Sequence, residues 1–192
     1  MKKNQKIFLV SKSPRRKQLL EELGLHFEIL HTNVDEIHPE HFSPLQIAEY
    51  LSQLKLTPIN FLKYSDNDIF ISCDTLVVLD DKILGKPSTE DEAKNMLRQL
   101  SGRTHQVISG LTVSTMGKTD TKHRITGVTF KILTEQEIQY YVTHYKPFDK
   151  AGGYGIQEWI GLIGVTSIHG CYYNVMGLPT QLLMEMLPQQ NL

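Results

Sequence analysis

The sequence predicts an α/β protein, in which buried strands alternate with amphipathic helices. The clearest strand pattern lies at residues 69–79, I-F-I-S-C-D-T-L-V-V-L, where apolar side chains occupy both faces. A strand that is buried on both faces is typical of the centre of a sheet covered by helices. Helical spacing of apolar residues at 43–57 and 89–100, each segment starting at a capping residue, predicts two of the covering helices.

Length, charge and cysteine content limit the class of protein. The 192 residues suffice for one large domain or two small lobes. A net charge of −1 argues against a broad nucleic-acid-binding surface, and two cysteines make no disulfide framework. No apolar run approaches the ~20 residues that cross a bilayer. We therefore expect a cytoplasmic protein without nucleic-acid or membrane partners.

The first expected strand, residues 7–10, leads directly into a basic segment. Ser13 is a good helix N-cap and Pro14 a good first helical residue. Arg15 and Arg16 follow in the first turn, where positive charge opposes the helix dipole. A bound anion, most naturally phosphate, would resolve that conflict. The alternative is a pair of solvated surface arginines.

Asp74 interrupts the central strand pattern. A lone carboxylate within an apolar strand costs several kcal/mol unless it is paired or holds a metal. Asp74 therefore lies at the strand's open end, facing a cleft, or has a partner there. An ordinary capped strand end is the alternative. The residues that follow, a turn at 80–81 and a short strand near 83–84, could return Lys86 towards the same place.

Two further charged residues are candidates for the same site. Asp35 and Glu36 follow an expected strand at 27–30, and one of them could join Asp74 around Mg²⁺ or Mn²⁺. A solvated loop explains this acidic pair equally simply. Lys55, near the end of the second helix, is either a surface or helix-dipole lysine or a residue that reaches the cleft.

In the second half of the chain, alternation at residues 105–114 predicts a half-buried strand, followed by a turn at 116–121 and a second strand at 122–133. A capping box formed by Thr134 and Glu137 begins a helix. We expect its buried face to include Ile138, Tyr141, Val142 and Tyr145.

The glycine-rich segment 147–157 would present Asp149, Lys150 and Gln157, although it matches no phosphate-loop pattern and a plain loop is the alternative. We expect a strand at 160–168, a turn or short strand at 170–177, and a closing helix at 179–187.

Taken in order, these motifs resemble the Maf family of nucleoside triphosphate pyrophosphatases. The matching patterns are S-x-S-P-R-R at 11–16, D-E at 35–36, D-T-x-V at 74–77, K-P at 86–87, L-S-G-x-T-H-x-V at 100–107, D-K-A-G-x-Y-x-I-Q at 149–157 and Y-N-V-x-G-L-P at 173–179. Any one of them is weak, but together they cover nearly the whole chain.

The resemblance implies a single Maf-like domain over residues 1–192, with a mixed sheet flanked by helices and two lobes around a nucleotide-binding cleft, as in ITPase-like folds. It implies hydrolysis of a nucleoside triphosphate to the monophosphate and pyrophosphate, by water attack at the α-phosphate, with Mg²⁺ or Mn²⁺ as cofactor. A homodimer would be in keeping with the family.

The resemblance also implies residue roles. Asp74 would accept the proton of the attacking water, hold the metal, or both, and Glu36 would help to hold the metal. Lys86 would contribute to catalysis by holding the phosphates. The residues expected to bind substrate are Ser11, Ser13, Arg15, Arg16, Thr75, Lys150 and Gln157.

Within the family, Arg15, Thr75 and Gln157 resemble the branch that acts on dTTP and UTP. A neutral glutamine amide can donate to and accept from a uracil or thymine edge. The branch that acts on 7-methyl-GTP usually has Trp and Glu in place of Arg15 and Gln157. Departures from the family pattern are Ser72-Cys73, where small apolar residues are usual, and Glu158, where Gly is common.

Two other functions compete with this interpretation. Asp74 could be the nucleophile of an aspartyl phosphatase, but the D-x-D arrangement of such enzymes is absent. The chain could also be a nucleotide-binding regulatory protein linked to cell division, with little turnover.

Overall fold

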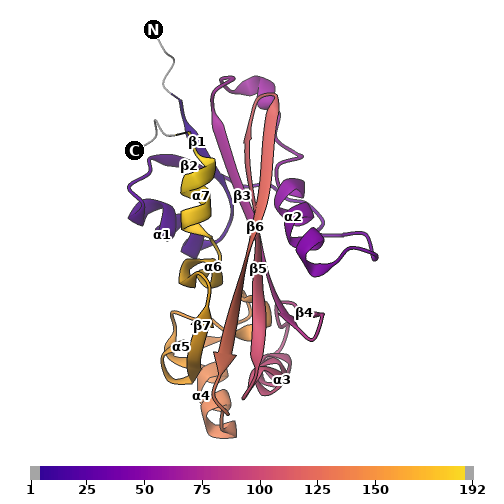
Figure 1. Ribbon diagram of the computed structural model, residues 1–192, viewed down its shortest axis with the longest axis vertical. Helices are drawn as coiled ribbons and strands as arrows, with labels where there is room; N and C mark the ends of the chain where they lie inside the picture. The colour runs from indigo at the N-terminus through magenta and orange to yellow at the C-terminus, as the bar shows by residue number, and fades with distance from the viewer. Residues whose placement is uncertain (1–4, 189–192) are drawn as a thin grey trace. The chain divides into compact units, whose positions relative to one another are not determined.

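The computed structural model describes residues 5–188 and confirms an α/β fold with a mixed sheet (Figure 1). Seven strands are joined in the order β2-β1-β3-β5-β6-β7, with β4 paired to β3. β1 runs parallel to β2 and β3, whereas β4 and β7 are antiparallel to β3 and β6. The strands are β1 (Ile7–Val10), β2 (Phe27–Leu30), β3 (Ile69–Leu79), β4 (Lys82–Leu84), β5 (Thr104–Thr115), β6 (Lys118–Phe130) and β7 (Val165–His169).

Helices begin where the capping residues predict. Ser13, Ser43 and Thr134 each accept a hydrogen bond from a backbone N–H of the first turn. No helix within residues 5–188 is long and apolar enough to cross a membrane. The helices are α1 (Pro14–Glu22), α2 (Pro44–Leu54), α3 (Glu90–Leu100), α4 (Glu135–Tyr145), α5 (Trp159–Gly164), α6 (Tyr172–Met176) and α7 (Thr180–Met186), with 3₁₀ turns η1 (Phe61–Lys63) and η2 (Ala151–Gly153).

The described chain divides into two compact units. The first unit contains residues 5–74, 109–124 and 177–188, and the second contains residues 75–108 and 125–176. Each of β3, β5 and β6 contributes residues to both units. The candidate residues are therefore distributed between two separately packed bodies.

In the first unit, an aromatic cluster fixes the strand that carries Asp74. The rings of Phe8 on β1 and Phe70 on β3 stack at 5.1 Å, and the ring of Tyr64 meets both edge-on. Leu56, just after α2, is buried in the same cluster. The end of α2 is thus packed beside the start of β3.

α2 also lies directly on β5, at a position where only glycine fits. A Cβ atom at Gly110 would lie 2.1 Å from the carbonyl oxygen of Ala48 on α2. Backbone meets backbone there, so no side-chain rearrangement can relieve the overlap.

In the second unit, α3 and α4 pack together (Figure 1). Arg98 on α3 donates two hydrogen bonds of 2.8 Å to Glu135 on α4. Of the expected α4 face, Ile138, Tyr141 and Val142 are buried, but Tyr145 is exposed. The expectation for Tyr145 was wrong because this residue ends the helix, where its ring stacks on Tyr141 at 5.0 Å but stays exposed.

Expectations for the end of the second half were also wrong in part. The strand expected at 160–168 is helix α5 followed by the shorter strand β7, and residues 170–177 contain helix α6. A short apolar run has no period that separates strand from helix. At Gly161 the α5 backbone lies so close to Ile156 that an added Cβ would be 1.9 Å from its carbonyl oxygen.

The hairpin between β5 and β6 is tighter than expected. Its turn consists of Met116 and Gly117 only, since β5 extends to Thr115 and β6 begins at Lys118. β5 is also not half-buried throughout, because every residue from Val107 to Ser114 is buried. Small and hydroxyl residues such as Gly110 and Thr112 break the apolar pattern without being exposed.

Replacing Gly110 with Ala tests the α2–β5 contact. We expect the free energy of unfolding to fall by about 3 kcal/mol, as in other overpacked cores, when measured by urea denaturation. Gly85→Ala is the matched control, because nothing lies within 4 Å of its added Cβ. Equal stability of the two variants would contradict the close approach.

His105 on β5 gives a second test, through pH. It is buried, its Nε2 lies 2.6 Å from the Tyr154 hydroxyl, and desolvation lowers its pKa to about 4. The unfolded chain therefore binds the proton first as pH falls, and the folded state loses stability below an unfolded pKa of about 6.5. When the pH falls from about 7 to about 4.5, the free energy of unfolding should decrease by about 2 kcal/mol more in wild type than in His105→Gln, as measured by urea denaturation. Identical pH dependence would refute the buried neutral imidazole.

Candidate functional site

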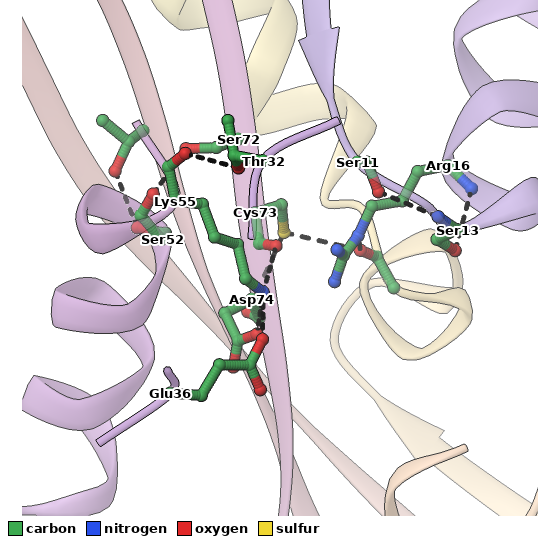
Figure 2. A network of polar contacts seen from close by, with 12 residues as sticks. Ser11, Ser13, Arg16, Thr32, Glu36, Ser52, Lys55, Ser72, Cys73 and Asp74 are labelled. Atoms are coloured by element: carbon green, nitrogen blue, oxygen red, sulfur yellow. Dashed lines mark hydrogen bonds and ion pairs between the residues drawn. The ribbon is translucent and has the colours of Figure 1, made fainter. Parts of the chain in front are cut away.

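Asp74 lies in the middle of β3 and is paired with a cation. It is 8% exposed, and the ammonium of Lys55, the residue after α2, donates a hydrogen bond to its Oδ1. The same Nζ lies 3.3 Å from Glu36 Oε1 and 3.4 Å from the carbonyl oxygen of Cys73 (Figure 2). Of the two placements expected for Asp74, the partnered one is correct and the strand end is not. We call Lys55, Asp74 and Glu36 the lysine–carboxylate cluster.

This cluster is partly buried, which makes its pairing important. The side chains of Lys55 and Asp74 are only 15% and 11% exposed, against 46% for Glu36. An ammonium has three N–H donors, and three acceptors surround this one. Removing the cation would leave two carboxylates without their shared partner, one of them buried.

Lys55 is not the surface lysine that was one expectation, because its side chain is only 15% exposed and its ammonium faces Asp74 and Glu36. That it reaches a cleft stays a prediction. From sequence alone Lys55 is not distinguished as a site residue, because a lysine at the end of an amphipathic helix is also the ordinary partner of the helix dipole. The available signal was indirect: Asp74 within an apolar strand required a cation.

Residues 11–16, which lead into the first turn of α1, form a second polar group in the first unit. Ser11 Oγ accepts the N–H of Ser13 at 3.1 Å, and Ser13 Oγ accepts the N–H of Arg16 at 3.5 Å (Figure 2). The first turn of α1 contains no acidic residue, and both Arg15 and Arg16 are half-buried. Positive charge is thus concentrated at a helix N-terminus, where an anion is stabilised.

One carbonyl group connects this segment with the strand of Asp74. The carbonyl oxygen of Gly177, between α6 and α7, accepts hydrogen bonds from Arg16 Nε at 2.8 Å and from Cys73 Sγ at 3.4 Å. Cys73 precedes Asp74 on β3. The segment carrying Arg16 and the strand carrying Asp74 are therefore fixed to one acceptor.

The second unit contains the remaining candidates. Thr75 follows Asp74 on β3 and is half-buried, and Lys86 is exposed. The N–H of Gly152 donates to the carbonyl oxygen of Gly85 at 3.0 Å, which joins the segment of Lys86 to that of Lys150.

Lys150 is buried, with its charge balanced inside the unit. Its Nζ lies 2.7 Å from Asp149 Oδ1 and 3.1 Å from Glu158 Oε1. Glu158 also accepts a hydrogen bond from the hydroxyl of Tyr141, which in turn accepts the N–H of Gly155 at 2.9 Å. Burial, followed by the hydrogen bond to Glu158, raises the pKa of the Tyr141 hydroxyl, so it stays protonated.

These contacts hold the loop that leads to Gln157. The side-chain oxygen of Gln157 is buried and has no hydrogen-bond partner within residues 5–188. An unpaired buried amide oxygen costs free energy that a ligand's N–H group could recover. The loop could therefore recognise a polar edge.

Lys55→Met tests the energetic importance of the lysine–carboxylate cluster. Methionine retains the aliphatic stem but leaves Asp74 buried without its cation, so we expect the free energy of unfolding to fall by about 3 kcal/mol in urea denaturation. Lys17→Met is the control, because its exposed pair with Glu21, at 3.5 Å, should contribute less than about 0.5 kcal/mol. If Lys55→Met and Lys17→Met lowered the free energy of unfolding by the same small amount, Lys55 would not be paired as described.

Comparison with known proteins agrees with these motifs. The model of the family described as Maf-like protein matches residues 6–190. Curated relatives named dTTP/UTP pyrophosphatase include those of Flavobacterium psychrophilum, 47% identical over 93% of this chain and 91% of its own, and Phocaeicola vulgatus, 46% identical over 93% and 92%. The relative of the same name in Cytophaga hutchinsonii is 45% identical over 96% of this chain and 84% of its own. With nearly the whole chain covered, the protein belongs to the Maf family.

Proposed function

We propose that this protein hydrolyses nucleoside triphosphates, dTTP and UTP in particular, to the monophosphate and pyrophosphate. The observation that carries the proposal is the partly buried lysine–carboxylate cluster around Asp74 of β3, in a chain 47% identical to a dTTP/UTP pyrophosphatase. Concentrated positive charge at the start of α1 supports it, because a triphosphate is strongly anionic.

In the proposed reaction, a water molecule attacks the α-phosphorus. A new P–O bond forms to the water oxygen, the bond to the bridging oxygen of the β-phosphate breaks, and pyrophosphate leaves. Asp74 accepts the water proton. Lys55 fixes the orientation of that carboxylate, and an oriented base accounts for about 10²–10⁴-fold of typical rate enhancements. Arg15, Arg16 and Lys86 offset the phosphate charge.

A divalent metal ion fits the donor set of the first unit. Lys55 Nζ faces one oxygen of each of Glu36 and Asp74, and the second oxygen of each carboxylate is the hard ligand that a divalent ion would use. Within residues 5–188 there is no group of three or more metal-ligating side chains, and Mg²⁺ is commonly held by one or two carboxylates together with substrate phosphates. We propose that Glu36 and Asp74 hold Mg²⁺ or Mn²⁺ in this way. The ion would neutralise triphosphate charge when bound.

Base selection is proposed to rest on Gln157 and Thr75. The unpaired buried oxygen of Gln157 can accept the N3–H of uracil or thymine, and its amide N–H can donate to a neighbouring carbonyl of the base. A methylated guanine carries positive charge and suits a carboxylate better than this neutral amide.

Turnover of a nucleotide panel tests the proposal. Purified protein with Mg²⁺ or Mn²⁺ should release monophosphate and pyrophosphate from dTTP and UTP, and much less from CTP, GTP or 7-methyl-GTP. Asp74→Asn should lose at least about 100-fold in kcat and remain folded by circular dichroism, since it preserves volume but cannot accept the proton.

Each contrary result points elsewhere. Comparable turnover of 7-methyl-GTP would sink the pyrimidine assignment. Tight binding without turnover would indicate a nucleotide-binding regulator, and a trapped phospho-aspartate would indicate a covalent phosphatase.

A further inference from the structure

The last turn of α2 is held from outside the helix by two hydroxyl groups. Ser72 Oγ on β3 donates to the carbonyl oxygen of Ser52 at 2.5 Å, and Thr32 Oγ1, in the loop after β2, donates to the carbonyl oxygen of Lys55 at 2.8 Å (Figure 2). The final carbonyls of a helix have no partner within it. In a continuing helix the N–H of Leu56 would donate to the carbonyl oxygen of Ser52. Here it donates to the carbonyl oxygen of Gln53 at 2.9 Å, so the carbonyl oxygen of Ser52 is available to Ser72.

The position of Ser72 relates this contact to the lysine–carboxylate cluster. Ser72 and Asp74 are two residues apart on β3, so their side chains point to the same face of the sheet. Ser52 and Lys55 are three residues apart and lie on one side of the helix end. The same face of β3 thus holds α2 at Ser52 and receives the ammonium of Lys55.

Other contacts also hold α2, among them the burial of Leu56, just after the helix, in the aromatic cluster of β1 and β3. Gly110 meets α2 at Ala48, and the hydroxyls of Ser52 and Thr112 lie 2.6 Å apart in the buried interface with β5. Ser72 and Thr32 differ from these contacts because they bond backbone carbonyls of the helix end itself, those of residues 52 and 55. Loss of either bond would loosen the backbone from which the Lys55 side chain extends.

We propose that Ser72 and Thr32 are positioning residues for the hydrolysis, and that they act by holding the last turn of α2 so that Lys55 stays between Asp74 and Glu36. Neither residue needs to touch the substrate. The inference rests on the proposed function, since it assumes that Lys55 orients the reacting carboxylate. A misplacement of about 1 Å in such an arrangement can cost up to about 100-fold in rate.

The test compares hydroxyl-removing variants with hydroxyl-retaining ones. We expect Ser72→Ala and Thr32→Val to lower kcat for dTTP about tenfold, with KM within about twofold of wild type, because orientation and not binding is lost. Thr32→Ser retains the hydroxyl and should keep near-wild-type kcat. Ser114→Ala is the matched control: the hydroxyl of this buried serine of the same unit bonds Thr119 Oγ1 at 2.8 Å and not the carbonyl groups of α2, so its loss should leave kcat unchanged.

A double-mutant cycle separates positioning from a general loss of stability. In a Lys55→Met background, Ser72→Ala should lower kcat no further, because the group it positions is already absent. Additive effects of the two substitutions would overturn the proposal, and so would a kcat of Ser72→Ala and Thr32→Val equal to that of Ser114→Ala.

A readout that needs no turnover keeps this inference distinct from the proposed function. The ¹⁵N resonance of the Lys55 ammonium, identified by its absence in Lys55→Met, should be observable in wild type and broadened or shifted in Ser72→Ala. If wild type hydrolysed no nucleotide, the proposed function would fail while this measurement still decided whether Ser72 positions Lys55. An unchanged resonance in Ser72→Ala would overturn the positioning role.

Discussion

The structure of the candidate site depends on one ammonium group that two carboxylates share. Asp74 could not occupy the middle of a buried strand without compensation, because an isolated carboxylate there would cost several kcal/mol. Lys55 supplies that compensation, and it draws Glu36 to the same point. The stability of β3 and the arrangement of the proposed base therefore rest on one contact. Such coupling explains how a charge can be retained in a buried strand.

The second unit uses the same electrostatic arrangement on a loop. Lys150 is buried between Asp149 and Glu158, as Lys55 is between Asp74 and Glu36. In the first case the lysine holds a strand carboxylate, and in the second it helps to hold a glycine-rich segment that is also bonded to Gly85 and Tyr141. Lys86, by contrast, is exposed, as suits a residue proposed to meet a mobile anion.

The sequence predicted local features well and spatial relations poorly. Helix starts at Ser13, Ser43 and Thr134 were predictable because each cap is a contact between near neighbours. The need of Asp74 for a cation was also visible, but its identity was not, since Lys55 is 19 residues away and its type is common at helix ends. Helix α5 was missed because six residues with two glycines show neither helical nor strand period. The hydroxyl contacts of Ser72 and Thr32 left no pattern at all.

The reactivity of the Cys73 thiol would report local opening of β3. This thiol is fully buried beside Asp74 and donates to the Gly177 carbonyl, whereas Cys171, the other cysteine of the chain, is half-buried. A thiol reagent can reach Cys73 only when the middle of β3 is transiently exposed. The alkylation rate of Cys73, divided by the rate for a cysteine in an unfolded peptide, therefore gives the fraction of molecules in which β3 is open. That fraction gives the free energy of local opening at the centre of the site.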